Sequence, residues 1–198
     1  MLTVNSSIDP KKYKLEAIAA LIYESGPALF GLIFGRQAIS LLTRLVKGEQ
    51  NHYSYRNLHI AEIEGQVLGV AVMVTAEELH NNRDHKKLLN SWQHLRQKLV
   101  YKLIFNRFLK ENYPHKSCYV ANLAVHPEYR GRGIGTKLLE SCLEKAKGLG
   151  STSVWISVDI DNSRAQKLYE SVGFKMVETK KMLLFGQAIG SNILVKSL

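Results

Sequence analysis

Cysteine is scarce in this 198-residue chain, which contains only Cys118 and Cys142. Both fall on the apolar faces of expected secondary-structure elements, so a framework of disulfide bridges is not expected. The N-terminus also lacks a basic flank followed by a signal-peptide core. Together these features predict a reduced protein of the cytoplasm.

Long hydrophobic runs are missing as well. The longest apolar stretch without a charge lies around residues 27–34, whereas about 20 residues are needed to span a bilayer. The sequence therefore predicts neither a membrane-spanning segment nor a membrane partner. Because the chain is 45% hydrophobic, it is long enough for one well-buried domain and short for two, and we expect a single domain over residues 1–198.

The sequence also lacks the spacing of a metal site. Four histidines fall close together in the middle of the chain, at His80, His85, His94 and His115. They form no His-x-x-x-His pair and have neither a cysteine partner nor clustered carboxylates, so we expect no metal there. Solvent-facing positions on polar helix faces are expected for them instead.

Positive charge is what the chain has in excess. Its 27 lysines and arginines outnumber 17 aspartates and glutamates, for a formal net charge of +10. An excess of this size suggests a polyanionic ligand or partner. A phosphorylated ligand, a nucleic acid and a basic surface without a partner all remain open at this point.

A compact turn rich in glycine and arginine lies at residues 126–136, with the sequence HPEYRGRGIGT. It joins an apolar strand expected at residues 118–125 to a helix whose apolar positions recur from Leu138 to Ala146. Glycines let the backbone visit positive φ and let phosphate oxygens approach main-chain N–H groups at a helix N-terminus. The turn has neither the Gly-x-Gly-x-x-Gly pattern nor a Walker ending. It therefore predicts a seat for a pyrophosphate, with a plain connecting turn as the alternative.

A second motif follows another apolar strand, expected at residues 154–158. Residues 161–174 predict a short helix that ends at Gly173. Asn162 suits a helix cap, and Tyr169 could simply fill the core, so this motif alone is only moderately specific.

Taken in order, the two motifs resemble those of the GNAT superfamily of N-acetyltransferases. Arg130-x-x-Gly133-x-Gly135 resembles the acyl-coenzyme A signature of that superfamily. The run Asn-x-x-Ala-x-x-Leu-Tyr-x-x-x-Gly-Phe is matched at Asn162, Ala165, Leu168, Tyr169, Gly173 and Phe174. The resemblance is strongest over residues 118–177, and it implies acetyl transfer from acetyl-coenzyme A to a primary amine without a metal.

The resemblance also implies a role for individual residues. The pyrophosphate is expected beside Arg130 and on the amides of Gly131, Arg132, Gly133, Ile134, Gly135 and Thr136. The pantetheine arm is expected along the strand edge at Leu123, Ala124 and Val125 and on Asn162, with a backbone N–H of that edge polarising the thioester. Tyr169 is expected to bind the cosubstrate and to protonate the departing thiolate, because a phenol has a reference pKa of about 10.

The general base is not assigned by the resemblance. Some relatives carry a glutamate five positions before the asparagine, and Ser157 occupies that position here. Glu62, Asp159, His126 and a chain of water molecules remain alternatives. The missing acid also leaves open a non-catalytic acyl-coenzyme A sensor or adaptor. The hypothesis of a nucleic-acid-binding module rests on the net charge alone, so nucleic acid is not an expected partner.

The order of expected elements fits an α/β (α+β) fold. Residues 2–6 predict a strand, Asp9 and Pro10 begin a helix that ends at Gly26, and a second helix spans Ala38 to Gly48. A hairpin follows at residues 59–63 and 66–74. The resemblance implies a mixed, central, mostly antiparallel twisted sheet that is splayed between strands four and five and flanked by helices.

Residues 76–117 form an insertion between strands three and four that departs from this plan. Thr75-x-x-Glu78 predicts a capped helix start, and the segment carries nine basic against four acidic residues, about half of the net charge. An apolar stripe runs along it through Leu88, Trp92, Leu95, Leu99 and Leu103, with Ile104 and Phe108 beside it. This stripe has three possible interpretations: it packs on the sheet, it forms a homodimer surface, or it forms a wall of the acceptor site. The acceptor itself, a small-molecule or peptide amine, stays open.

Overall fold

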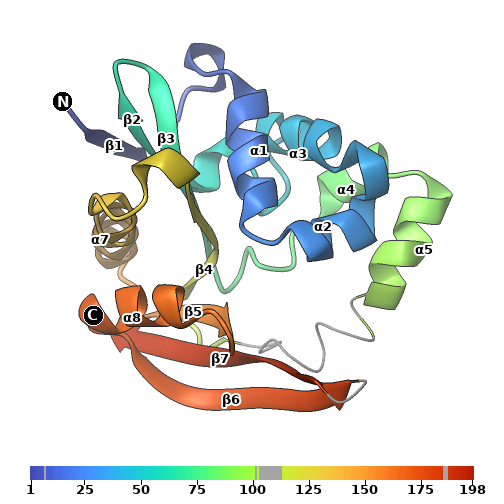
Figure 1. Ribbon diagram of the computed structural model, residues 1–198. Helices are drawn as coiled ribbons and strands as arrows, with labels where there is room; N and C mark the ends of the chain where they lie inside the picture. Colours follow the sequence, from blue (N-terminus) through green and yellow to red (C-terminus); the bar gives the residue numbers. More distant parts are fainter. Residues whose placement is uncertain (7, 101, 103–112, 185–186) are drawn as a thin grey trace.

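A single seven-stranded sheet organises the computed structural model, which describes residues 1–6, 8–100, 102, 113–184 and 187–198 (Figure 1). The strand order is β1-β2-β3-β4-β5-β7-β6. The strands are β1 (Thr3–Ser6), β2 (Leu58–Ile63), β3 (Gln66–Thr75), β4 (Ser117–Val125), β5 (Ser153–Asp159), β6 (Lys175–Leu184) and β7 (Gln187–Ser197). Neighbouring strands are antiparallel except β4 and β5, which are parallel. The expected mixed, mostly antiparallel sheet is confirmed.

The sheet opens between its two parallel strands. Pairing of β4 with β5 starts at Ser117 and Ser153 and ends at Val120 and Ile156. Beyond this point β4 continues to Val125 against β3, and β5 continues against β7. The edge that β4 turns toward β5 is thus free of a partner strand, as expected for the splay.

The β2–β3 hairpin turns where the sequence predicts it. Glu64 and Gly65 both have positive φ, at 51° and 79°. Two such residues in a row give the twist that suits a two-residue hairpin. The observed strands lie within one residue of the expected ones.

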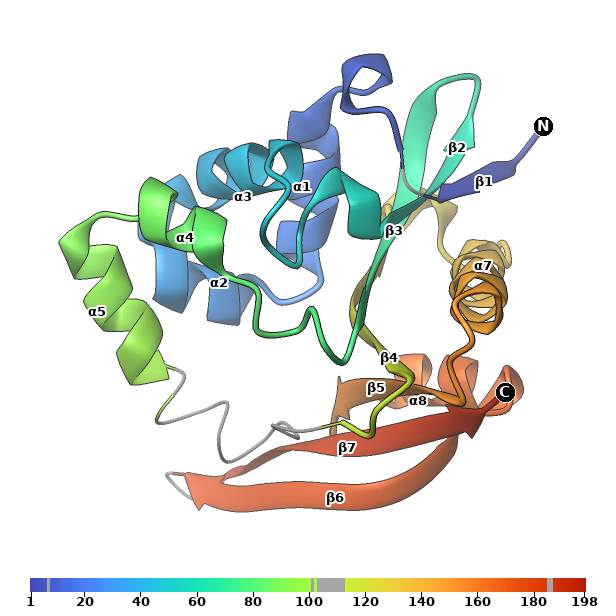
Figure 2. The same cartoon turned by 180° about the vertical axis from the view of Figure 1, so that it is seen from behind.

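Helices cover both faces of the sheet, and the two views agree on the arrangement (Figures 1 and 2). On one face α1 (Leu15–Glu24), α2 (Pro27–Phe34) and α3 (Ala38–Lys47) build a core that includes Ile18, Ile22, Phe30, Leu42 and Leu45. On the other, α7 (Ile134–Gly148) packs with α8 (Ser163–Ser171) around Leu138, Leu139, Cys142 and Tyr169. Both cysteines are buried free thiols.

The N-terminal helices differ from the sequence expectation. Asp9 caps the 3-10 turn η1 (Pro10–Lys12) by accepting a hydrogen bond from Lys11 N, but the chain then extends at Tyr13. The α-helix expected from Pro10 therefore starts at Leu15. A further helix, α2, was not expected: it begins with Pro27, whose fixed φ suits a first helical position.

Helices α2 and α3, joined by η2 (Gly35–Gln37), form an apolar stretch that was not anticipated as a whole. By length and composition alone, Pro27–Lys47 could cross a membrane. It is interrupted at Gly35, where φ is 65°, and its Phe30, Leu42 and Leu45 side chains are fully buried in the core. Packing inside the protein accounts for the buried part of this stretch, whereas Leu32 and Ile39 are 50% and 41% exposed.

The first helix of the insertion begins later than the capping motif at Thr75 predicts. Thr75 Oγ1 does accept a hydrogen bond from Glu78 N at 3.3 Å, yet the following residues form turns. Thr75 is still paired with Cys118 in the sheet, so the chain cannot yet coil. The described helices are α4 (Arg83–Leu88) and α5 (Ser91–Val100).

The apolar stripe of the insertion does not pack on the sheet where it is described. Leu88 is half-buried against the first core, but Trp92, Leu95 and Leu99 are 66%, 55% and 56% exposed. Helix α5 instead contacts α2, and Arg96 donates a hydrogen bond to Gly31 O at 3.0 Å. Leu103, Ile104 and Phe108 lie outside the described residues.

Candidate functional site

The glycine-rich turn leaves β4 through the 3-10 turn η5 (Pro127–Tyr129) and enters α7 at Ile134. Gly131 and Gly133 have φ of 82° and 75°, the left-handed region that a side chain rarely adopts. No atom lies within 4 Å of the position a Cβ would take at either glycine. The backbone thus curls around open space in front of the first N–H groups of α7, where an anion is favoured.

Gly135 serves a different purpose from the other two glycines. It lies inside α7, and a Cβ there would stand 2.9 Å from Leu168 Cδ2. The absence of a side chain lets α7 approach α8. The motif therefore combines two positions of backbone curvature with one of close helix packing.

The two arginines of the turn contact the protein itself. Arg130 Nε donates to Val125 O at 2.9 Å, and its Nη2 lies 3.7 Å from Glu24 Oε2. Arg132 lies over the ring of Tyr129, at 5.2 Å from its centroid. Arg130 consequently braces the end of β4, while Arg132 stands over a tyrosine.

A cavity of about 480 Å³, the turn cavity, extends over this turn. Its lining includes all the residues expected to hold the cosubstrate except Arg132: Leu123, Ala124, Val125, Arg130, Gly131, Gly133, Ile134, Gly135, Thr136, Asn162 and Tyr169. The structure therefore brings together residues of β4, the turn, α7 and α8 that the two motifs placed apart in the sequence.

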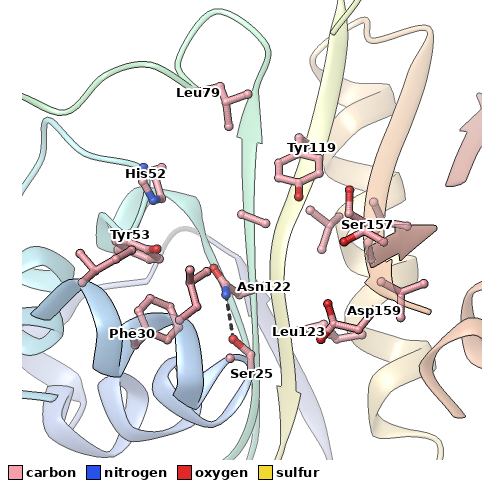
Figure 3. A pocket seen from close by; sticks show the side chains of 18 of the residues that line it. Ser25, Phe30, His52, Tyr53, Leu79, Tyr119, Asn122, Leu123, Ser157 and Asp159 are labelled. Atoms are coloured by element: carbon pink, nitrogen blue, oxygen red, sulfur yellow. Dashed lines mark hydrogen bonds between the residues drawn. The ribbon is translucent and has the colours of Figure 1, made fainter. Parts of the chain in front are cut away.

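A second cavity of about 670 Å³, the aromatic cavity, lies over the other side of the splay. Its aromatic wall is formed by Phe30 and Phe34 of α2, His52 and Tyr53 of the loop after α3, and His85 of α4, and Tyr113 and Tyr119 also line the cavity. Figure 3 shows Phe30, His52 and Tyr53 on one side of β4 and Ser157 and Asp159 on the other. The insertion contributes His85 to this wall, whereas none of the described residues of its apolar stripe lines the cavity.

The two cavities share one wall. Ser25, Leu123, Asn162, Ala165 and Tyr169 line both of them. Asn122 Nδ2 donates to Ser25 Oγ at 2.7 Å, which ties the end of α1 to β4 at this junction (Figure 3). A group held in one cavity can thus reach a group held in the other where β4 leaves β5.

Tyr169 stands at the junction with only 6% of its surface exposed. Burial raises the pKa of its hydroxyl, and the nearby Tyr119 and Asp159 raise it further. The phenol therefore stays protonated at neutral pH and is a proton donor rather than a base.

Asn162 fills the structural role that its sequence position suggests. Its Oδ1 accepts a hydrogen bond from Ala165 N at 3.1 Å and so caps α8. The same residue lines both cavities, which leaves its side chain beside any ligand that crosses the junction.

The candidates for the general base differ in what they contact and in whether they line a cavity. Glu62 accepts a hydrogen bond from Asn5 beside β1 and lines neither cavity. The His126 ring packs against Tyr129. Asp159 lines the aromatic cavity from an exposed position at the end of β5, and desolvation and the charge of Asp161 raise its pKa. Ser157 also lines that cavity, and its Oγ is buried.

Two histidines of the aromatic wall were missed or misplaced by sequence reasoning. Nothing in the sequence singled out His52, and His85 was expected to face solvent. Both are buried, with rings 5.6 Å apart, and His85 Nδ1 lies 2.9 Å from Gln97 Nε2. Burial and the nearby His85 lower the pKa of His52 to about 3, and burial lowers that of His85 to about 4. The spacing of His85 with Leu88 and Leu89 on one apolar face was the only available signal.

Metal ligands do not gather in the part of the chain that the structure describes. No group of three or more His, Cys, Asp or Glu side chains there could hold a metal ion.

Comparisons with known proteins agree with this geometry. A family model described as "Acetyltransferase (GNAT) family" matches residues 33–174. N-alpha-acetyltransferase 30 of Schizosaccharomyces pombe is 41% identical over 56 residues, which are 28% of this chain and 37% of that protein. The match thus spans well under half of that relative.

Solved structures resemble the chain over nearly its whole length. A crystal structure described as that of an acetyltransferase is 28% identical, covers 98% of each chain and has a TM-score of 0.66. An N-acetyltransferase from Staphylococcus aureus Mu50 has a TM-score of 0.72 at 21% identity, covering 99% of this chain and all of that one. The second likeness concerns the fold alone.

Proposed function

The chain belongs to the acetyltransferase (GNAT) family, and from this premise we propose that it transfers an acetyl group from acetyl-coenzyme A to a primary amine. The observation that carries the proposal is the meeting of the turn cavity and the aromatic cavity at Tyr169. One cavity suits a phosphorylated donor and the other an acceptor, and a protonated phenol stands between them.

The turn cavity fits the donor substrate. The open space at Gly131 and Gly133 leaves room for phosphate oxygens against the N–H groups that begin α7. The free edge of β4 offers the backbone groups of Leu123 to an extended pantetheine arm, in the manner of an added strand. Those of Ala124 face β3, as do those of His126, whose N donates a hydrogen bond to Leu68 O. The acetyl group then reaches the junction.

Transfer proceeds in this arrangement by direct attack. The neutral amine nitrogen bonds to the thioester carbon, and a backbone N–H of the β4 edge stabilises the oxyanion. Collapse of the tetrahedral intermediate breaks the carbon–sulfur bond, and the thiolate takes the proton of the Tyr169 hydroxyl. The attacking nitrogen gives up one proton to solvent, and the Tyr169 phenolate regains one from there.

A non-catalytic acyl-coenzyme A sensor is the second candidate. Ser157 favours it, because this position lines the acceptor side and carries no acid. The sensor would bind acetyl-coenzyme A in the same turn cavity and release no thiol.

Calorimetry and a thiol assay together test the proposal. We expect titration with acetyl-coenzyme A to give one site per chain, and a panel of primary amines to release coenzyme A thiol in a time-dependent way. Binding without thiol release on any amine would favour the sensor, whereas absence of binding would contradict both candidates.

The cytoplasm is the proposed location. Cys118 and Cys142 are buried as free thiols, which supports a reducing compartment.

A further inference from the structure

The aromatic cavity differs in charge from the protein that contains it. The chain has 27 lysines and arginines, yet none is among the described residues that line this cavity. Asp159 is the one carboxylate among those residues. Any ligand there meets aromatic and neutral polar groups along most of its surface and a negative charge at one place.

The aromatic wall opposite Asp159 is uncharged as well. The His52 and Tyr53 rings are 4.0 Å apart, and Tyr53 meets Phe30 edge-to-face at 5.8 Å. His52 and His85 are neutral at pH 7, because their pKa values lie at about 3 and 4. Phe30 and His52 are themselves buried, so the half-buried Tyr53 ring presents most of the aromatic surface, beside Leu29 and Leu79. This neutral lining favours an aromatic or apolar ligand.

The position of the carboxylate completes the arrangement. Asp159 ends β5, on the opposite side of β4 from Phe30, His52 and Tyr53 (Figure 3). Asp159 shares the cavity with Leu123 and Tyr169 of the junction. The negative charge thus lies near the end of the cavity where acetyl transfer is proposed, and the neutral rings lie away from it.

We propose that the acceptor is an aryl-alkyl monoamine, whose ring lies against Phe30, His52 and Tyr53 and whose ammonium group pairs with Asp159 before it loses a proton. This assignment rests on the proposed acetyl transfer for its biological meaning. A cavity of about 670 Å³ falls within the range of roughly 300–1,000 Å³ that small-ligand sites occupy.

Other classes of amine fit this lining less well. Polyamines and amino sugars with several amines would bury positive charges for which the described lining residues offer no carboxylate besides Asp159, and each unpaired charge is costly to desolvate. Acceptors with acidic groups would find no lysine or arginine among the described lining residues. Peptides would have to extend beyond the cavity after their first residues.

The first test is a panel of acceptors at saturating acetyl-coenzyme A. Phenylethylamine, tyramine and tryptamine are compared with spermidine, kanamycin and a tetrapeptide with a free N-terminal alanine. We expect kcat/KM for the best aryl-alkyl amine to exceed that for spermidine by about 100-fold, in line with two missing charge pairings. A higher kcat/KM for spermidine, kanamycin or the peptide overturns the inference.

A binding measurement keeps this inference separate from the proposed activity. Tryptamine is titrated into the protein saturated with coenzyme A, with calorimetric detection. Binding at one site supports the assignment of the cavity even if no amine is acetylated, a result that would instead contradict the enzymatic proposal. Absence of tryptamine binding overturns the inference whatever the activity on other amines.

The role of Asp159 is tested by charge removal at constant size. Asp159→Asn should weaken tryptamine about 10-fold, the effect of losing one charged hydrogen bond. Tryptophol, which carries a hydroxyl in place of the amine, should bind the variant and the native protein equally. The matched control is Asp161→Asn, which removes a charge from the same turn outside the cavity lining and should change tryptamine binding less than about two-fold. Equal weakening of tryptamine and tryptophol, or by both variants, contradicts an ion pair at Asp159.

Discussion

The turn cavity and the aromatic cavity meet at Tyr169 but are built in different ways. The turn cavity is made largely of main chain: the curl at Gly131 and Gly133, the start of α7 and the free edge of β4. The aromatic cavity is made of side chains from α2, the loop after α3, the insertion, β4 and β5. A site made of backbone needs glycine at fixed places, whereas a site made of side chains can be lined in many ways.

This difference suggests that the two cavities contribute differently to the choice of donor and acceptor. Backbone N–H groups recognise phosphate and amide groups that every donor of this kind carries. In our proposal, the neutral rings and Asp159, the one carboxylate among the described lining residues, select the shape and the charge of the acceptor. We therefore infer that donor chemistry follows from family membership and that acceptor choice follows from the aromatic cavity alone.

The largest expected effect concerns Tyr169, one of the residues that line both cavities. Tyr169→Phe removes the proposed proton donor and leaves the ring in place, so kcat should fall about 100-fold or more. The dissociation constant of acetyl-coenzyme A should stay within about two-fold, as measured by calorimetry. Tyr13→Phe is the control, because its hydroxyl accepts from Asn5 near β1 and lines neither cavity. An unchanged kcat in Tyr169→Phe would mean that the tyrosine only fills the core.

The next prediction concerns how acid affects the stability of the aromatic wall and of the opposite side of the sheet, beside α7. His52 and His85 of the aromatic wall have folded pKa values of about 3 and 4, below the usual 6.5, because burial disfavours their charged forms. Between about pH 6.5 and pH 4 the unfolded chain binds more protons than the folded one, so the free energy of unfolding falls as the pH falls. One pKa unit corresponds to about 1.4 kcal/mol, so the loss by pH 4 should reach several kcal/mol.

Urea titrations at several pH values measure this loss. Burial and Lys145 also lower the pKa of His59, beside α7, to about 4. His59 therefore adds to the same loss of unfolding free energy, and variants are needed to separate its effect from that of the aromatic wall. His85→Gln should flatten the pH dependence of the unfolding free energy. Equal slopes in the native protein and this variant would show that the aromatic wall is already open to water and charged.

The contrast between backbone and side chains also explains what the sequence could predict. Gly131, Gly133, Asn162 and Tyr169 were identified because their roles depend on local conformation and fixed spacing, and the structure brings all four to one place. The sheet and its splay followed from the same motifs. His52 and His85 could not be identified, because their burial depends on how α2, the loop after α3 and α4 pack together.

Two features of the insertion have the same physical origin, namely the wrongly predicted helix start and the exposure of the apolar stripe. Thr75-x-x-Glu78 has the local chemistry of a helix start, but pairing of Thr75 in β3 overrides it. The stripe at Trp92, Leu95 and Leu99 has the periodicity of a buried face, yet α5 contacts α2 and leaves that stripe exposed. Local patterns specify a preference, and tertiary packing decides which preference is realised.

A smaller effect is expected from the third glycine of the turn. Gly135→Val would push α7 away from Leu168 of α8 and should cost about 1–3 kcal/mol of unfolding free energy. Because α7 and α8 both line the turn cavity, acetyl-coenzyme A should bind about 10-fold more weakly, while tryptamine binding should change less. Gly148→Ala at the other end of α7 has open space around it and should shift stability by less than about 1 kcal/mol. Equal loss of both ligands would show that the two cavities do not behave as separate units.

The smallest effect on the folded chain is expected at the exposed stripe of the insertion, which we propose to be a homodimer surface. Trp92 and Leu99 are more than half exposed on a helix whose neighbouring segment carries part of the aromatic wall. Light scattering should give the mass of two chains for the native protein and of one chain for Trp92→Glu. Unfolding free energy of the single chain should change by less than about 0.5 kcal/mol, because the residue is exposed there. Acetyl-coenzyme A affinity should be retained, since the turn cavity is built from other elements. A native protein with the mass of one chain would contradict the proposed dimer.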